Sequence, residues 1–331
     1  MKKLLINAFL GAACLLSCVD ASGMDQEVCK VIDSPEHQKA YHELISNLQK
    51  QQKETESEIE LLKENAKAKI KDLIKTSGVD VKAIYKQKDK YGNVREQSAL
   101  MNAVRCQDVE AVEVLLELGA DVNMMVERWT PLTEAVAIGN IEIVKTLLAQ
   151  SGIDINKSGA GSPALCHAAS SKKLIDIFKL LMNRPDIKIN GSPNDRGTAL
   201  IHAVWSKNLS AVEMLLGKSD IDVNETEDKE NLITALHYAV HRGNTDIIGL
   251  LLKHSKIDVN VQDGNGNTPL HWAMRIKDSG LGNSVVLLLL QHEKIHTNLR
   301  NKDGKTPLEL ARSILSDNDP RIKKLKEIGA Q

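Results

Sequence analysis

The chain has 331 residues, a formal net charge of -1 and only 3% aromatic residues. This charge balance excludes a protein that binds nucleic acid as a basic platform over its whole surface. A composition rich in aliphatic residues and poor in rings favours a helical protein over a sandwich or a barrel.

Residues 1–23 have the pattern of a secretory signal peptide: two lysines, then an apolar run of 13 residues, too short to span a bilayer comfortably. Two processing routes fit this pattern. The stretch LLSC resembles a bacterial lipobox, which implies a lipid on Cys18, although a leucine stands where a small residue is usual. Alternatively, a signal peptidase cuts after Ala21 or Gly23. The first route predicts a bacterial outer-membrane lipoprotein, because Val19 follows the anchor, and the second predicts a periplasmic or secreted chain.

Apart from Cys18, three cysteines remain after either cut, at positions 29, 106 and 166. Their odd number and wide spacing exclude a disulfide framework, and they have no zinc-site spacing. We therefore expect no metal and no cofactor.

Residues 24–36 are interpreted as a short tether. The next segment, 37–77, contains no glycine or proline between residues 40 and 76, and we therefore predict a long, polar helix within it. Its second half carries an apolar stripe, formed by Ile59, Leu62, Ala66, Ile70 and Leu73. We expect residues 59–76 to cap the domain that follows and 37–58 to form a stalk. A dimeric or trimeric coiled coil, which would allow self-association, is the alternative. A lysine stripe at positions 63, 67, 71 and 75 is either a solvated face or a contact for anionic lipid.

Two short phrases recur in register from residue 98 onward. The first, as in TPLHWAM at 268, contains an anchor leucine at intervals of 32 to 38 residues: Leu100, Leu132, Leu165, Leu200, Leu236, Leu270 and Leu308. The second, as in KIDVN, ends on an asparagine: Asn123, Asn156, Asn190, Asn224, Asn260 and Asn298. A repeat of this period predicts a solenoid in which stacked units bury one another's apolar faces.

These phrases closely resemble the ankyrin repeat, with six full units and a truncated seventh over residues 98–331. The resemblance implies an all-α solenoid of paired antiparallel helices with β-hairpin-like fingers. It also implies a monomeric array that binds a protein partner and is not an enzyme. Residues 78–97 are interpreted as a linker, and IKTSGVDV at 74–81 resembles the end of a degenerate repeat.

The first phrase contains the signals that begin a short helix. Thr268 is expected to cap it, because its hydroxyl accepts from an early amide, and Pro269 suits the first helical position. Thr306 and Pro307 repeat this arrangement and add a capping box, and Pro131 takes the same place in its own unit.

The histidine of this phrase, here His237 and His271, links neighbouring repeats by hydrogen bonds in the family. A catalytic or phosphate-binding role for DGNGNTPLHWA is disfavoured, because it lacks the third glycine of a dinucleotide fingerprint. Only His237 with His241, four residues apart, could chelate a metal, and the structural role is the preferred interpretation.

Two positions of the first helix vary between units. Two residues after the anchor leucine stand Asn102, Glu134, His167, His202, Tyr238 and Trp272; five residues after it stand Arg105, Ala137, Ser170, Trp205, His241 and Arg275. Family geometry exposes the second set on the concave surface, and stacking should gather the rings of both sets. We predict partner binding at Trp205, Tyr238, His241, Trp272 and Arg275, since Trp, Tyr and Arg anchor interfaces. Inter-repeat packing is the alternative for the first set.

Two fingers are further candidates. Met124, Met125 and Trp129 would give an adaptable contact at the tip of the first finger, or fold back on the next one. Glu227 and Asp228, in a longer finger, would contact a basic partner or simply be solvated. In the sixth unit, four extra residues between the helices indicate either a mobile bulge or, as the preferred interpretation, an insertion that is tolerated in a surface loop.

The sequence therefore predicts an exported, non-enzymatic scaffold for protein interaction. A structural or protective envelope protein is the alternative from another class. A third hypothesis is an array that neutralises a toxin or acts on a host protein.

Overall fold

The computed structural model of the chain describes residues 56–78, 80–88, 94–158, 162–191 and 197–330. The predicted signal peptide, Cys18, the tether and all of the stalk except residues 56–58 lie outside these residues. The chain divides into two compact units, Met1–Ala160 and Gly161–Gln331. None of the helices in the described ranges is long and apolar enough to cross a membrane.

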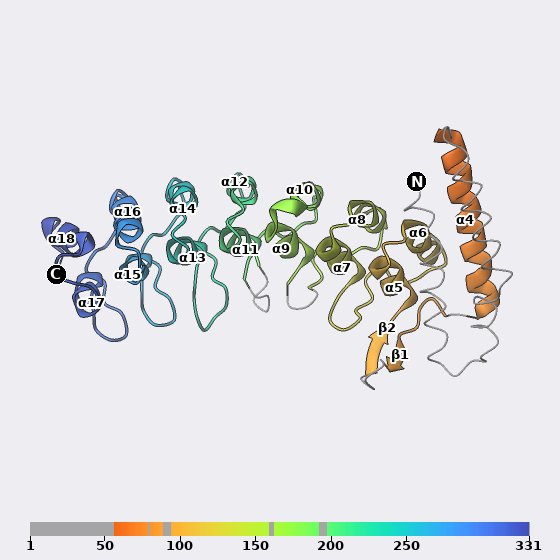
Figure 1. Ribbon diagram of the computed structural model, residues 1–331, viewed down its shortest axis with the longest axis horizontal. Coiled ribbons are helices and arrows are strands. Elements are labelled where there is room, and N and C mark those ends of the chain that lie inside the picture. The colour runs from red at the N-terminus through yellow and green to blue at the C-terminus, as the bar shows by residue number, and fades with distance from the viewer. Residues whose placement is uncertain (1–55, 79, 89–93, 159–161, 192–196, 331) are drawn as a thin grey trace. The chain divides into compact units, whose positions relative to one another are not determined.

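The described part of the first unit begins with the predicted helix, α4 (Glu56–Ser77), which lies alongside α6 (Figure 1). Its elements after α4 are β1 (Tyr85–Lys88), β2 (Val94–Gln97), α5 (Ala99–Arg105), α6 (Val109–Glu117), α7 (Pro131–Ile138) and α8 (Ile141–Leu148). Ile70 and Ile74 are buried, whereas Leu73 is exposed, contrary to the predicted stripe. The buried face of α4 includes Ile74 in place of Leu73. This is because α4 contacts α6 along a row of residues that are four apart.

Two lysines of the predicted basic stripe face the first repeat. The ammonium group of Lys67 lies 2.9 Å from Glu113, and that of Lys71 lies 3.1 Å from Glu117, both on α6. These pairs give the cap its orientation on the repeat, and they occupy charges that a lipid-binding stripe would need.

The segment expected to be a linker forms an antiparallel hairpin, in which Tyr85 pairs with Gln97 and Lys88 with Val94. A second, very tight hairpin lies at the tip of the first finger. Val126 and Trp129 exchange both backbone hydrogen bonds, and the two residues between them have positive φ angles of 49° and 71°. Both angles fit a type I′ turn, which here holds Glu127 and Arg128 in place of the usual Asn-Gly.

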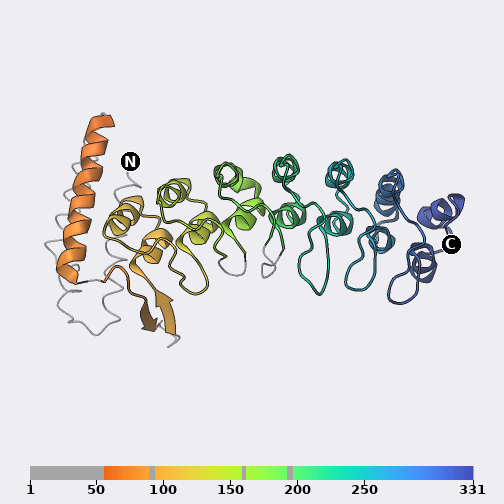
Figure 2. The same cartoon turned by 180° about the vertical axis from the view of Figure 1, so that it is seen from behind.

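The second unit is a regular stack of helix pairs in two rows, which are visible from both sides (Figures 1 and 2). We call the first helix of each pair inner and the second outer. The inner helices are α9 (Ala164–Ala169), α11 (Ala199–Trp205), α13 (Ala235–His241), α15 (Pro269–Met274) and α17 (Pro307–Ile314). The outer helices are α10 (Ile175–Met182, after a 3₁₀ turn at Lys172–Leu174), α12 (Leu209–Leu216), α14 (Thr245–Leu252), α16 (Ser279–Leu290) and α18 (Pro320–Glu327). The all-α repeat solenoid expected from the sequence is confirmed.

The helix starts follow the predicted chemistry. The Thr268 hydroxyl accepts from the His271 amide with Pro269 in the first turn, and Thr306 forms a capping box with Glu309. Pro131 occupies the same place in α7 after its Thr130 cap. The core between the helix rows is aliphatic, as the composition required.

The extra residues of the sixth unit are not a mobile bulge, and that prediction was wrong. They lengthen α16 to 12 residues, where the other outer helices of this unit have 8. This longer helix contains Gly282, and Arg321 of α18, which is 1% exposed, lies against that glycine. A Cβ on Gly282 would stand 2.6 Å from the Arg321 guanidinium, so this glycine provides space for the arginine.

The last helix closes the stack with Ile322 and Leu325, which are both fully buried. Ile328 is 44% exposed, because α18 ends at Glu327. Arg321 is the third buried residue of this helix.

Candidate functional site

Four rings gather on the inner helices α11, α13 and α15. The Trp205 ring lies 5.2 Å from Tyr238 in an edge contact and 6.4 Å from His241 in a parallel stack. Trp272 lies 5.6 Å from His241 and 6.4 Å from Tyr238, both edge-on. We call these four residues the aromatic patch. The predicted gathering of these side chains is therefore what the structure shows.

The two variable positions differ in exposure, as the repeat pattern implies. Trp205 is 47% exposed, and His241 and Arg275 at the equivalent position are also exposed. Tyr238 and Trp272 are half-buried. The patch thus has a half-buried side, formed by Tyr238 and Trp272, and an exposed side, formed by Trp205 and His241. Aromatic residues that anchor an interface are usually part buried and part exposed in this way.

Hydrogen bonds fix the two half-buried rings. The Tyr238 hydroxyl donates to Glu227 of the long finger, and Trp272 Nε1 donates to Asp263 Oδ2 at 2.8 Å. Burial together with the bond to Glu227 raises the pKa of Tyr238, so its hydroxyl stays a donor. The patch is therefore held in shape before any partner arrives, which limits the entropy lost on binding.

The interpretation of Glu227 and Asp228 as free contacts for a basic partner is not supported. Glu227 accepts from Tyr238, and Asp228 accepts from the backbone amides of Glu230 and Asn231 within its own turn. These bonds lower the pKa of Asp228. Asp228 therefore stabilises the turn of the longer finger, and Glu227 fixes the position of the Tyr238 ring in the patch.

Asp263 supports the patch from beneath. It is 6% exposed and accepts from the backbone amides of Asn265 and Asn267 as well as from Trp272. Burial alone would raise the pKa of Asp263, but these hydrogen bonds lower it below its ordinary value. Sequence reasoning missed this residue, and only its place in DGNGNTPLHWA, nine residues before Trp272, could have indicated it.

The two phrase histidines lie in the frame of the stack. His237 Nδ1 accepts from the Thr234 amide, and its Nε2 is 3.1 Å from the Asn267 carbonyl of the next unit. His271 repeats this with Thr268 and, at 3.0 Å, with the Lys305 carbonyl. Since Nδ1 accepts, the proton sits on Nε2 and bonds the neighbouring repeat.

Arg242 also belongs to the site and was missed. It caps the C-terminus of α13, and its guanidinium lies 4.9 Å from the centre of the Trp205 ring. This is a cation–π contact. Its position, one residue beyond the second variable position, held no pattern across units that could have predicted it.

The remaining candidates lie elsewhere. His167 and His202 are half-buried on α9 and α11. Of the three candidates on the first finger, Met125 is exposed, at 39%, while Met124 and Trp129 are half-buried. These residues of the first finger belong to the first unit. In that unit Arg105 of α5 forms ion pairs with Glu127 on the first finger and with Glu134 on α7.

No group of three His, Cys, Asp or Glu side chains in the described part of the chain has metal-site geometry. His237 is buried and bonded, whereas His241 is exposed and stacked on Trp205. The rings and cations of the patch can bind another molecule.

A stack of capped helix pairs with a variable, exposed inner face defines a repeat solenoid of the interaction type. The family model for ankyrin repeats in three copies matches residues 63–159, 151–227 and 224–281, and the single-repeat model matches 265–302. Together these matches cover well over half of the chain, and the chain belongs to the ankyrin repeat family.

Individual relatives match over short stretches. Alpha-latrocrustotoxin-Lt1a of Latrodectus tredecimguttatus is 35% identical over 103 residues, which are 31% of this chain and 7% of that protein. The 2-5A-dependent ribonuclease of Homo sapiens is 39% identical over 85 residues, 24% of this chain and 12% of that one. The chain spans less than a fifth of the length of either relative.

Two solved structures share the fold. The ankyrin repeat domain of Bcl-3 has a TM-score of 0.55 at 23% identity, over 70% of this chain and 98% of that domain. The human ASB11 ankyrin repeat domain has a TM-score of 0.53 at 22% identity, over 70% and 97%. Ankyrin repeats indicate a scaffold for protein–protein interaction, and such domains are in general not enzymes.

Proposed function

We propose that this chain is a non-enzymatic scaffold that captures its protein partner on the aromatic patch. The observation that carries the proposal is the exposed Trp205 ring, held between Tyr238, His241 and the Arg242 guanidinium. Exposed rings in a fixed frame supply contact area at low entropic cost, and interface energy is concentrated in such residues.

The first test removes that ring. A photoreactive amino acid at the Ser170 position, the exposed residue of the same variable set at the end of the neighbouring helix α9, would cross-link the partner in the full chain and its native host for identification by mass spectrometry. Trp205→Ala is then expected to weaken binding of that partner by about thirtyfold, the usual loss at an interface anchor.

Leu287→Ala is the matched control, because Leu287 is an apolar residue of the outer helix α16 with 38% exposure. This variant should bind as the unmodified chain does. Equal affinities for Trp205→Ala and Leu287→Ala, in chains with the same thermal unfolding, would remove the patch from the binding site.

The proposal includes export and a lipid tether at Cys18, on the strength of the N-terminal pattern alone. The expected result is a mature chain that begins at Cys18 and whose intact mass includes two or three acyl chains. Cys18→Ser should abolish the added mass and release the protein from the membrane fraction. An unmodified N-terminus at Ser22 or Met24 would replace the tether by soluble export.

The alternative of a lipid- or wall-binding envelope protein is weakened by the ion pairs of α4. Lys67 and Lys71, half of the predicted basic stripe, are paired with Glu113 and Glu117. No observation favours toxin neutralisation or a host protein as the target.

A further inference from the structure

Four exposed cations lie within a few residues of the rings of the aromatic patch in the sequence: Lys207, Arg242, Arg275 and Lys277. All lie at or just after the C-termini of the inner helices α11, α13 and α15, on the loops that lead to the outer helices. Within the described part of the chain, none of the four is ion-paired with a carboxylate. Their charge is therefore available to a partner.

Arg242 is the best oriented of the four. Its guanidinium lies over the Trp205 ring at 4.9 Å, and this cation–π contact favours a guanidinium held close to the ring. A stacked guanidinium keeps its N–H donors along its edge, where they match the two oxygens of a carboxylate. Stacking thus prepares Arg242 to bind an acid next to the ring.

The nearby carboxylates keep their negative charge, but most of them are bonded within the fold. Glu227 is bonded to Tyr238, and Asp263 is buried beneath Trp272. On the loops, Asp278 caps α16 and Asp246 lies in the first turn of α14, where helix N-termini favour anions. The inference therefore rests on the position of Arg242 over the exposed Trp205 ring and not on a net charge.

We propose that the aromatic patch binds an extended acidic segment of the partner protein. Carboxylates of the segment pair with Arg242 and Arg275, and an apolar or aromatic side chain between them packs on Trp205 and His241. This inference rests on the proposed function and reverses the charge of the partner that the acidic finger had indicated. Complementary charge would also speed the encounter and make binding depend on salt.

The test uses a display library of random 12-residue peptides, selected on the full-length chain. Enriched peptides should carry a net negative charge, with an apolar or aromatic residue between acids. The double variant Arg242→Glu, Arg275→Glu should lower the affinity of the best peptide at least about tenfold, because each charge pair becomes repulsive. Raising the salt concentration should weaken binding of this peptide to the unmodified chain.

The matched control is Lys253→Glu with Lys323→Glu, the same change in charge at exposed residues of α14's end and of α18. Its effect should stay within about twofold, since a Debye length of about 8 Å screens distant charges. Enrichment of neutral or basic peptides, or an equal loss in the control, would overturn the acidic segment. If Trp205→Ala still weakens the cross-linked partner in that case, the scaffold function stands and only the partner class is wrong.

Discussion

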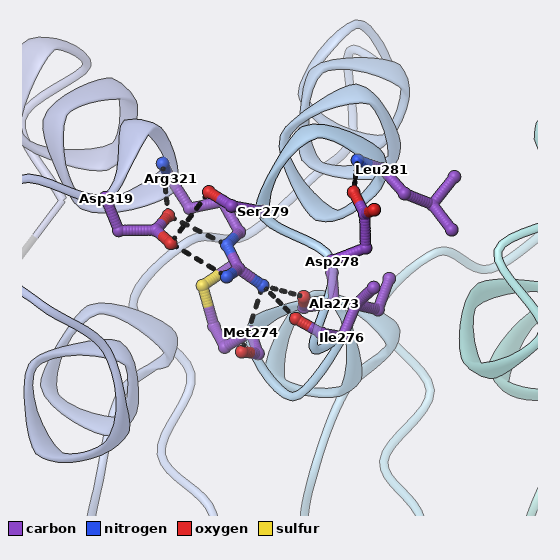
Figure 3. A network of polar contacts seen from close by, with 8 residues as sticks. All are labelled: Ala273, Met274, Ile276, Asp278, Ser279, Leu281, Asp319 and Arg321. Carbon is purple, nitrogen blue, oxygen red and sulfur yellow. Dashed lines mark hydrogen bonds and ion pairs between the residues drawn. The ribbon is translucent and has the colours of Figure 1, made fainter.

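Replacing Arg321 by methionine is expected to destabilise the C-terminal end of the stack by about 3–5 kcal/mol, the usual cost of breaking a buried ion pair. Arg321 makes two bonds to Asp319, both at 2.9 Å. Its Nη1 donates to three carbonyls at the end of α15, from Ala273, Met274 and Ile276 (Figure 3). Methionine fills the volume but leaves the carboxylate and these carbonyls unpaired.

The loss should appear in hydrogen exchange of α16 and α18, because repeats unfold locally and one global midpoint does not describe them. Lys323→Met is the control, since Lys323 is exposed on the same helix. Similar exchange in the two variants would show that the Arg321 network does not stabilise the end of the array.

A substitution at Gly282 tests the role of the Arg321 network independently. Gly282→Ala is expected to destabilise, because its Cβ would meet a guanidinium held by five hydrogen bonds. Gly249→Ala in α14 has no atom within 4 Å of the new Cβ and should instead stabilise by about 0.5–1 kcal/mol. Combining Gly282→Ala with Arg321→Met should cost less than the two separate losses, because the clash disappears with the arginine.

The sequence predicted the frame of this protein well because the frame is built from local signals that recur. Thr268, Pro269 and His271 each act within one turn of helix or on the adjacent repeat, so seven copies of one phrase reveal them. The gathering of Trp205, Tyr238 and Trp272 was predictable for the same reason, since equivalent positions of stacked units lie side by side.

The misses depend on contacts between residues far apart in the chain. The bonds from Tyr238 to Glu227 and from Arg321 to the end of α15 follow from how loops of particular lengths fold back. No single phrase records them. The choice of Ile74 over Leu73 depends on the angle at which α4 meets α6, which a stripe of apolar letters does not specify.

Acidification from pH 7 to pH 4.5 is expected to act in opposite directions on the two units. In the second unit, burial lowers the pKa of His237 from 6.5 to about 4. Between these values the unfolded chain binds a proton that the folded chain does not, so stability falls as the pH drops. The neutral ring is required because Nδ1 accepts from the Thr234 amide.

In the first unit, burial raises the pKa of Asp108, the cap of α6, to about 6. Here the folded chain binds the proton first, so stability rises as the pH falls from 6 towards 4. Each shift is about two units, which corresponds to at most about 3 kcal/mol for each group. The repeats near α6 should therefore become better protected while those around α13 become less protected.

Hydrogen exchange of α6 and α13 across this pH range, corrected for the intrinsic exchange rate, measures both effects in one molecule. Asp108→Asn keeps the cap, as Asn140 and Asn208 do in α8 and α12, and should remove the gain in α6 only. His237→Gln should lower the stability of α13 at pH 7 and remove its loss on acidification. Protection that changes in the same direction in both units would mean that one of the two buried groups is not the titrating group. Opposite changes, each abolished by its own variant, would show that the frame of the array responds to pH from two separate positions.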